Sequence, residues 1–234
     1  MDPRLEKLYA SGLKLNRDYI RDVLKLDGET AERVAEISGG IHADEAELLA
    51  RLVRDADPSV SIEIGLGYGF SALTILASAP NPDHRHVIID PHQTSYWKSG
   101  GWDNLRDAGF ADRVRLIEDF SYAALPKLLA EGVSADLIFI DGWHTFDFVF
   151  TDFFLGDKLL KPGGTVIFDD ADWPSIRPVI RYAVTNLAYE VVGALPEKRA
   201  RTERDIELGI EGSCIGLRKP ATPPEREIFF HKDF

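Results

Sequence analysis

The stretch SIEIGLGYGFSALTI, Ser61–Ile75, indicates the fold of this chain. A short apolar run ends in three glycines at alternate positions, Gly65, Gly67 and Gly69, and a second apolar run follows. Glycine is costly inside a strand or a helix, and it serves where the backbone is left-handed or where another group approaches closely. A strand, a glycine turn and a helix in this order can hold a nucleotide or nucleoside at the helix N-terminus. We therefore expect a ligand or a backbone to lie close to this turn.

Composition restricts the classes of partner. The chain has 234 residues, enough for one α/β domain with additions at its ends. Its net charge of −12 repels phosphate backbones and anionic lipid surfaces, so neither nucleic acid nor a membrane is an expected partner. The single cysteine, Cys214, cannot form an intrachain disulfide or a zinc cluster. Because no secretory signal or membrane-length apolar run is visible, we expect a cytoplasmic protein.

Short apolar runs alternate with helical patterns after Pro58. The expected strands are 60–65, 85–90, 113–119, 135–141 and 164–170, with two more at 189–195 and 212–218. The expected helices between them are 69–78, 101–109, 121–131, 146–159 and 174–187. Strands alternating with helices at this spacing predict βαβ units, and hence a doubly wound, mostly parallel, seven-stranded α/β sheet.

The regions outside this alternation have different patterns. Residues 1–57 have helical spacing and are expected to form an N-terminal extension, either a lid or the interface of a homo-oligomer, a dimer or higher. Residues 58–220 would form the ligand-binding domain and 221–234 a C-terminal tail. Within that domain the segment 196–211 is densely charged and is expected to be an exposed excursion before the last strand.

Carboxylates follow most of the expected strands. Asp90 ends the second strand, Asp141 the fourth, and Asp169 with Asp170 the fifth. Aspartate at a strand-to-helix junction often caps a helix, and for any one of these residues capping is a sufficient explanation. Ligands of open α/β sheets collect at the carboxyl ends of the strands, however, and so many carboxylates there favour a site.

The glycine turn differs from the dinucleotide pattern G-x-G-x-x-G, because its third glycine comes one residue early. Glu63 lies two residues before the first glycine, where it is unfavourable for a pyrophosphate and favourable for a cationic or zwitterionic ligand. Asp90 is placed to accept hydrogen bonds from both hydroxyls of a ribose. Together these residues indicate a nucleoside ligand without a phosphate group.

The segments IEIGLGYGFSALTI and LKPGGTVIFDD resemble those of the class I S-adenosylmethionine-dependent methyltransferases, and the resemblance extends over about residues 41–218. It implies a Rossmann-like methyltransferase fold and S-adenosylmethionine as the cofactor. The cofactor contacts that it implies are Glu63, Gly65, Gly67, Tyr68, Gly69, Ser71, Asp90, Ser121, Asp141 and Trp143. One departure is EDFSYAALP, because relatives usually have glycine at the end of the third strand.

Two further motifs, DGWH and FDDADW, resemble those of the metal-dependent O-methyltransferases, both the catechol type and the macrolide sugar type. The resemblance implies that Asp141, Asp169 and Asp170 bind Mg²⁺ or another divalent cation and that Trp143 packs on the adenine. It makes Asp141 and His144 the catalytic residues, with His144 as the base. The catechol enzymes have lysine at that position, whereas the sugar enzymes have histidine.

The expected reaction is methyl transfer to a hydroxyl of a small molecule, such as a sugar or another secondary metabolite. A hydroxyl is a weak nucleophile at neutral pH, and a cation together with a neutral imidazole would assist its deprotonation. Two alternatives remain: a metal-independent N- or C-methyltransferase, and a non-catalytic binding subunit of the same fold. An NAD-dependent short-chain oxidoreductase would need Tyr-x-x-x-Lys, which this sequence lacks.

Other residues near the expected strand ends have simpler explanations. We expect His42 and His92 to be structural or peripheral. The aromatic segment 91–104 contains Tyr96, Trp97 and Trp102, which could line a substrate site, pack within their own loop or form a dimer contact.

Overall fold

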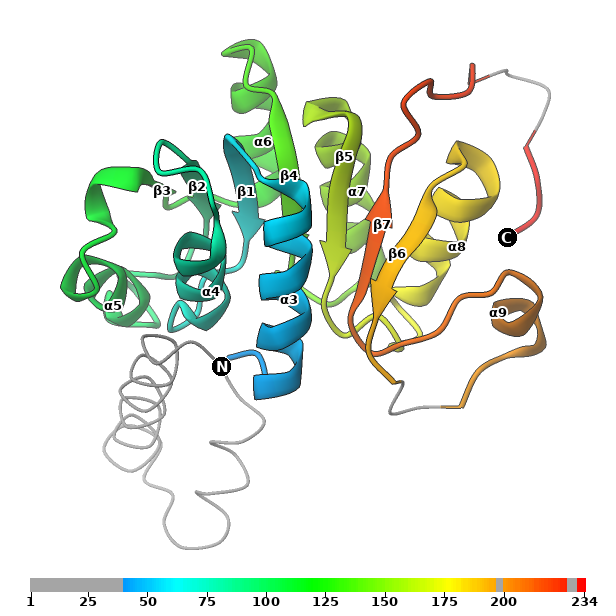
Figure 1. The fold of residues 1–234 in the computed structure, drawn as a ribbon, viewed down its shortest axis with the longest axis horizontal. Helices are drawn as coiled ribbons and strands as arrows, with labels where there is room; N and C mark the ends of the chain where they lie inside the picture. Colours follow the sequence, from blue (N-terminus) through cyan, green and yellow to red (C-terminus); the bar gives the residue numbers. More distant parts are fainter. Residues whose placement is uncertain (1–39, 197–199, 227–230) are drawn as a thin grey trace, which may run out of the picture.

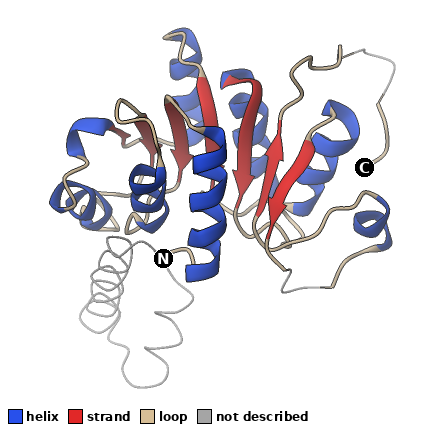
Figure 2. Ribbon diagram, in the orientation of Figure 1, coloured by secondary structure: helices blue, strands red, loops and turns tan. Residues whose placement is uncertain are grey.

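The computed structural model describes residues 40–196, 200–226 and 231–234, and it contains one seven-stranded sheet with helices on both faces (Figures 1 and 2). The strands are β1 (Val60–Ile64), β2 (Arg85–Ile89), β3 (Val114–Ile117), β4 (Ala135–Ile140), β5 (Leu160–Phe168), β6 (Glu190–Ala194) and β7 (Ile215–Arg218). The α-helices are α3 (Ala43–Ala56), α4 (Phe70–Ser78), α5 (Gly100–Asp107), α6 (Ser121–Ala130), α7 (Phe146–Leu159), α8 (Arg177–Leu187) and α9 (Glu203–Glu207).

The strand order is β3-β2-β1-β4-β5-β7-β6. The first five strands pair in parallel, whereas β7 is antiparallel to both β5 and β6. The predicted doubly wound, mostly parallel sheet is therefore confirmed. The order reverses between β1 and β4, which places the switch point beside the glycine turn.

Alternation along β4 builds a hydrophobic core on each face of the sheet. Leu137 and Phe139 face α3 and α4, while Ile138 and Ile140 face α6, α7 and α8. Successive side chains of a strand point to opposite faces, so a continuous apolar run is required when helices cover both. This is the reason why ADLIFI contains four large apolar residues in succession.

Helix α3 lies within the range that the sequence assigned to an N-terminal extension. Its Leu49, Leu52 and Val53 are buried in the core of one sheet face. The helices expected before it, with the lid or oligomer interface attributed to them, fall within residues 1–39, outside the described residues. Among the helices that are described, none is long and apolar enough to cross a membrane.

Strand β5 begins four residues earlier than expected, at Leu160 rather than at 164. Leu160 pairs with Ala135, and the register then shifts before Leu137 pairs with Thr165. Gly163, with φ of 81°, supplies a left-handed conformation within this irregularity. The sequence analysis began the strand at residue 164, whereas the structure places both glycines of LKPGG inside β5, at an irregularity in its pairing with β4.

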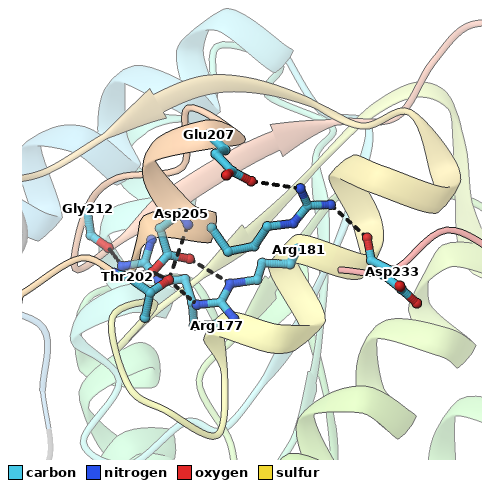
Figure 3. Close-up of polar contacts among 8 residues, drawn as sticks. Arg177, Arg181, Thr202, Asp205, Glu207, Gly212 and Asp233 are labelled. Carbon is cyan, nitrogen blue, oxygen red and sulfur yellow. Dashed lines mark hydrogen bonds and ion pairs between the residues drawn. The ribbon is translucent and has the colours of Figure 1, made fainter.

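The prediction that 196–211 is an exposed excursion is wrong for part of the segment. Residues 203–207 form α9, and Asp205 is only 3% exposed. Figure 3 shows the reason: Arg181 of α8 donates from Nε to Asp205 Oδ1 at 2.7 Å and from a second nitrogen to Thr202 Oγ1 at 2.8 Å. Local charge density does not reveal that a distant arginine pairs with one of these acids and buries it.

Candidate active site

The glycine turn lies between β1 and α4, and all three of its glycines have positive φ, at 93°, 52° and 84°. At Gly65 a Cβ atom would lie 2.0 Å from the carbonyl oxygen of Asp141. The group that approaches Gly65 is therefore the backbone at the end of β4. Gly69 is the N-cap of α4 in a left-handed conformation, which any other residue would adopt only with strain. The structure thus explains why Gly65 and Gly69 are glycines without reference to a ligand.

A cavity of about 890 Å³ opens at the carboxyl ends of the strands, where the switch point predicts it. Its wall includes ten of the residues that the sequence singled out: Gly65, Gly67, Ser71, Asp90, Ser121, Asp141, Trp143, His144, Asp169 and Asp170. Three others, Glu63, Tyr68 and Gly69, are absent from the wall. Tyr68 instead packs edge-on against Trp97, with the ring centres 5.1 Å apart.

Asp90 fastens the glycine turn to the end of β2. Its Oδ2 accepts hydrogen bonds from the amides of Leu66 and Gly67, both at 3.1 Å, and from Gln93 at 2.9 Å. Its Oδ1 accepts from the His92 amide at 2.8 Å. Each carboxylate oxygen offers two lone pairs; three donors share those of Oδ2 and one donor uses a lone pair of Oδ1, so the position still open is on Oδ1. A ligand hydroxyl could donate a hydrogen bond to Asp90 there. The carboxylate has no second free position, so it cannot accept from both hydroxyls of a ribose.

Glu63 is fully buried one layer behind the cavity wall. Its carboxyl group is hydrogen-bonded to the hydroxyl of Ser71 and, at 2.7 Å, to Nε2 of His86. Burial raises the pKa of Glu63 to about 8, and the hydrogen bond from Ser71 offsets only part of that effect. The sequence placed Glu63 beside the ligand, whereas in the structure Ser71 stands between Glu63 and the cavity.

His144 and the acidic residues after β4 and β5 occupy one side of the cavity. Nε2 of His144 lies 3.3 Å from Asp141 Oδ1 and 3.7 Å from Asp170 Oδ2. Burial opposes the charged imidazole, but the hydrogen bond to Asp141 and the two carboxylate charges outweigh it and raise the pKa of His144. Burial raises the pKa of Asp141 to about 6 and holds that of Asp169 well above its usual range. The fold therefore brings the four residues together, as the sequence predicted.

Asp141, Asp169 and Asp170 are also candidate ligands of a cation. All three aspartates supply oxygen, the ligand type that Mg²⁺ prefers, and Asp169 Oδ1 has no hydrogen-bond partner in the described part of the chain. The chemistry of these donors therefore fits a hard divalent cation. Within the described ranges, however, no three His, Cys, Asp or Glu side chains converge as a ready-made metal cluster. Closing the carboxylates around a cation would require side-chain movement.

Aromatic residues form much of the remaining wall. Tyr96 and Trp97 line the cavity, whereas Trp102 of the same segment does not. Trp143 is 61% exposed at the cavity wall, 6.5 Å from the ring of Phe148. Sequence reasoning missed Phe148 and Trp173, both in the wall. Their signal was their position shortly after the ends of β4 and β5.

The two histidines expected to be peripheral differ in position. His42 is the N-cap of α3 and forms a capping box with Glu45. His92 lines the cavity, and its ring packs edge-on against Phe120 at 5.8 Å. The first is thus explained by helix capping alone, and the second belongs to the aromatic wall.

Comparisons with known proteins agree with this geometry. Residues 62–171 match a family described as a methyltransferase domain. Tapetum-specific methyltransferase 1 of Arabidopsis thaliana is 31% identical over 146 residues, which are 62% of this chain and 60% of that protein. Tricin synthase 1 of Oryza sativa subsp. japonica is 33% identical over 143 residues, 56% of this chain and 52% of that protein. The chain thus spans between about half and three fifths of the length of these relatives.

A solved structure extends the likeness to nearly the whole fold. The O-methyltransferase TomG of Streptomyces achromogenes, in complex with S-adenosylmethionine, has a TM-score of 0.61 at 20% identity, over 94% of this chain and 91% of that chain. At this identity the likeness concerns the fold. The matched domain, the strand order and the motifs at the strand ends agree, and residues 62–171 of this chain are similar to a methyltransferase domain.

Proposed function

We propose that the chain is an S-adenosylmethionine-dependent O-methyltransferase that methylates a hydroxyl group of a small molecule, with a divalent cation as a second cofactor. The observation that carries this proposal is the charge of the cavity. Its wall contains the carboxyl groups of Asp90, Asp141, Asp169 and Asp170, and no lysine or arginine from the described residues. Such a site favours cations and disfavours phosphates. S-adenosylmethionine carries a sulfonium and an ammonium group and has no phosphate.

Methyl transfer to a hydroxyl group is supported by His144 and its neighbours. The imidazole lies in the wall, and its Nε2 is oriented toward Asp141, so it can hold a proton taken from a substrate hydroxyl while the carboxylate stabilises the charge. The ring of Trp173 packs against the imidazole, with the ring centres 5.3 Å apart. A cation held by Asp141, Asp169 and Asp170 would act as a Lewis acid and lower the pKa of the bound hydroxyl.

One observation favours a metal-independent methyltransferase as the second candidate. Nε2 of His144 lies within 3.7 Å of both Asp141 and Asp170, so the imidazole already neutralises part of their charge. A histidine supported by a carboxylate is a sufficient general base for an oxygen or nitrogen nucleophile.

Two measurements test cofactor binding and the need for a cation separately. Calorimetry should detect binding of S-adenosylmethionine to the chelator-treated protein, and methylation of a panel of catechols and hydroxylated glycosides should require added Mg²⁺. Methylation that persists in chelator would select the metal-independent candidate. Absence of cofactor binding would contradict the proposed function as a whole.

A further inference from the structure

A series of hydrogen-bonded polar side chains, buried except for the partly exposed Arg113 at its outer end, leads from the amino-terminal ends of β2 and β3 to the cavity wall. Arg113 lies 3.1 Å from His84 Nδ1, and His84 Nε2 lies 2.6 Å from the Ser61 hydroxyl. That hydroxyl lies 2.7 Å from His86 Nδ1, and His86 Nε2 lies 2.7 Å from Glu63 Oε2. Glu63 Oε1 is bonded to Ser71, which lines the cavity. Such a continuous path through an apolar core has no role in the function proposed above.

Arg113 fixes the donor-to-acceptor direction of this series of hydrogen bonds. A guanidinium only donates hydrogen bonds, so Nδ1 of His84 must accept and its Nε2 must carry the hydrogen. That hydrogen is donated to Ser61, whose own hydrogen is then donated to Nδ1 of His86. His86 in turn donates from Nε2 to Glu63. Both imidazoles must be neutral for this arrangement, and burial lowers the pKa of each to about 3.

The series of hydrogen bonds leaves one position for an additional proton, on Glu63 at the cavity end. Because His86 donates to Oε2 of Glu63, a proton bound by Glu63 must lie on Oε1, which faces Ser71. The other charged groups near Glu63 are Asp90 and Asp141, both of which act electrostatically against its ionisation. Burial also favours the protonated form, and the cavity wall contains no lysine or arginine of the described residues to oppose it.

We propose that Arg113, His84, Ser61 and His86 form a directional positioning relay that couples the binding of a cation beside Ser71 to the loss of one proton from Glu63. In the free protein Glu63 donates to Ser71. A ligand ammonium next to Ser71 stabilises the ionised carboxylate, the O–H bond of Glu63 breaks, and the proton leaves past Ser71 to the buffer. Ser71 then donates to Glu63 and offers a lone pair to the ligand. The inference rests on the proposed function only for the identity of that cation.

Calorimetry tests the coupling. S-adenosylhomocysteine, which carries the ammonium, should release most of one proton from Glu63 at pH 7 when titrated in buffers of different ionisation enthalpy, because burial raises the pKa of free Glu63 to about 8. Its affinity should increase about tenfold from pH 6 to pH 7. 5′-Methylthioadenosine lacks the amino acid and should release no proton. Glu63→Gln should release about one proton fewer than wild type and lose the corresponding part of the pH dependence, the remainder coming from Asp141, Asp169 and His144 of the same wall, whereas the exposed control Glu118→Gln should behave as wild type.

Nitrogen NMR of histidine tests the relay without any ligand. His84 and His86 should both be neutral between pH 5 and pH 8, with the hydrogen on Nε2. Arg113→Met should mix the tautomers and reduce proton release, Arg113→Lys should restore both, and Arg85→Met on the neighbouring strand controls for a general loss of folding. A charged histidine or a hydrogen on Nδ1 would overturn the relay. Failure of S-adenosylhomocysteine to bind would overturn the proposed function and the coupling, and the tautomers would still decide whether the relay exists.

Discussion

Two sets of buried acids in this molecule have opposite surroundings. Asp157 and Asp205, away from the cavity, are paired with cations: Lys219 lies 3.3 Å from Asp157, and Arg181 lies 2.7 Å from Asp205. Among the described residues, the charged groups that act on Asp141 and Asp169, in the cavity wall, are these two aspartates themselves, Asp170, Glu45, Glu63 and one histidine.

The pKa of Asp205 and the pKa values of Asp141 and Asp169 change in opposite directions as a result. Burial alone would raise the pKa of Asp205, but the bonds from Arg181 and Thr202 outweigh it and lower that pKa. Burial raises the pKa of Asp141 and of Asp169, and the mutual repulsion of the carboxylates adds to the effect. The first set stabilises the fold, whereas the second set is electrostatically unfavourable until a cationic ligand arrives. Four substitutions test this division.

The largest expected effect is on catalysis. Asp141→Asn should lower methyl transfer by about 1,000-fold, because it removes the carboxylate that supports His144 and a proposed cation ligand. Turnover at saturating cofactor measures this, and the thermal midpoint should not fall, because an unfavourable charge has been removed. If Asp141→Asn were destabilised as strongly as a variant that lacks a paired acid such as Asp205, the assignment of Asp141 to the unpaired set would be contradicted.

The opposite pattern is expected for the paired acid. Asp205→Ala should lower the free energy of unfolding by about 3 kcal/mol, because it leaves the partly buried guanidinium of Arg181 without its carboxylate. Denaturation by urea measures the loss, and turnover per folded molecule should equal that of wild type. The double variant with Arg181→Met should recover part of the stability. If activity fell with the single variant, α9 would have a role in the site.

The stability that Asp205 supplies should depend on pH with a definite sign. A carboxyl group whose pKa is lowered on folding stabilises the protein above its unfolded pKa of about 4, and that stability disappears as the pH falls through the folded pKa. The difference in unfolding free energy between wild type and Asp205→Asn should therefore be constant from pH 7 to pH 5 and shrink below pH 4. A difference that grew on acidification would contradict the pairing with Arg181.

The smallest effect is expected for an acid outside both sets. Asp147 is exposed on the first turn of α7, six residues after Asp141, and is absent from the cavity wall. Asp147→Asn should leave turnover unchanged and shift the thermal midpoint by no more than about 1 °C. It serves as the charge-matched control for Asp141→Asn. A large loss of activity here would mean that bulk negative charge, and not the position of the carboxylate, is what the site requires.

Much of the fold could be predicted because hydrophobic periodicity is local. The segments 135–141 and 146–159 were expected to form a strand and a helix, and the structure has β4 at Ala135–Ile140 and α7 at Phe146–Leu159. Local patterns were insufficient where a distant residue decides the outcome. Leu160 joins β5 only because Ala135 pairs with it, and Asp205 is buried only because Arg181 reaches it.

The candidate site likewise contains residues that could be grouped from the sequence and residues that could not. Asp141, His144, Asp169 and Asp170 could be grouped from sequence because all follow strands whose carboxyl ends meet at one edge of the sheet. Glu63 could not be placed correctly, because its partner His86 lies on the neighbouring strand and the contact depends on the register between β1 and β2. Phe148 and Trp173 join the wall through the packing of their loops and helices.

The sequence by itself determined the alternation of strands and helices, the glycine turn and the acidic strand ends, because each depends on residues that are close together in the chain. Only the tertiary structure decided what approaches each glycine and which acids acquire a cation. Gly65 admits the carbonyl of Asp141, and Glu63 bonds to His86 and Ser71 behind the cavity wall. Strand order and register set these contacts, and both result from the packing of residues that are distant in sequence.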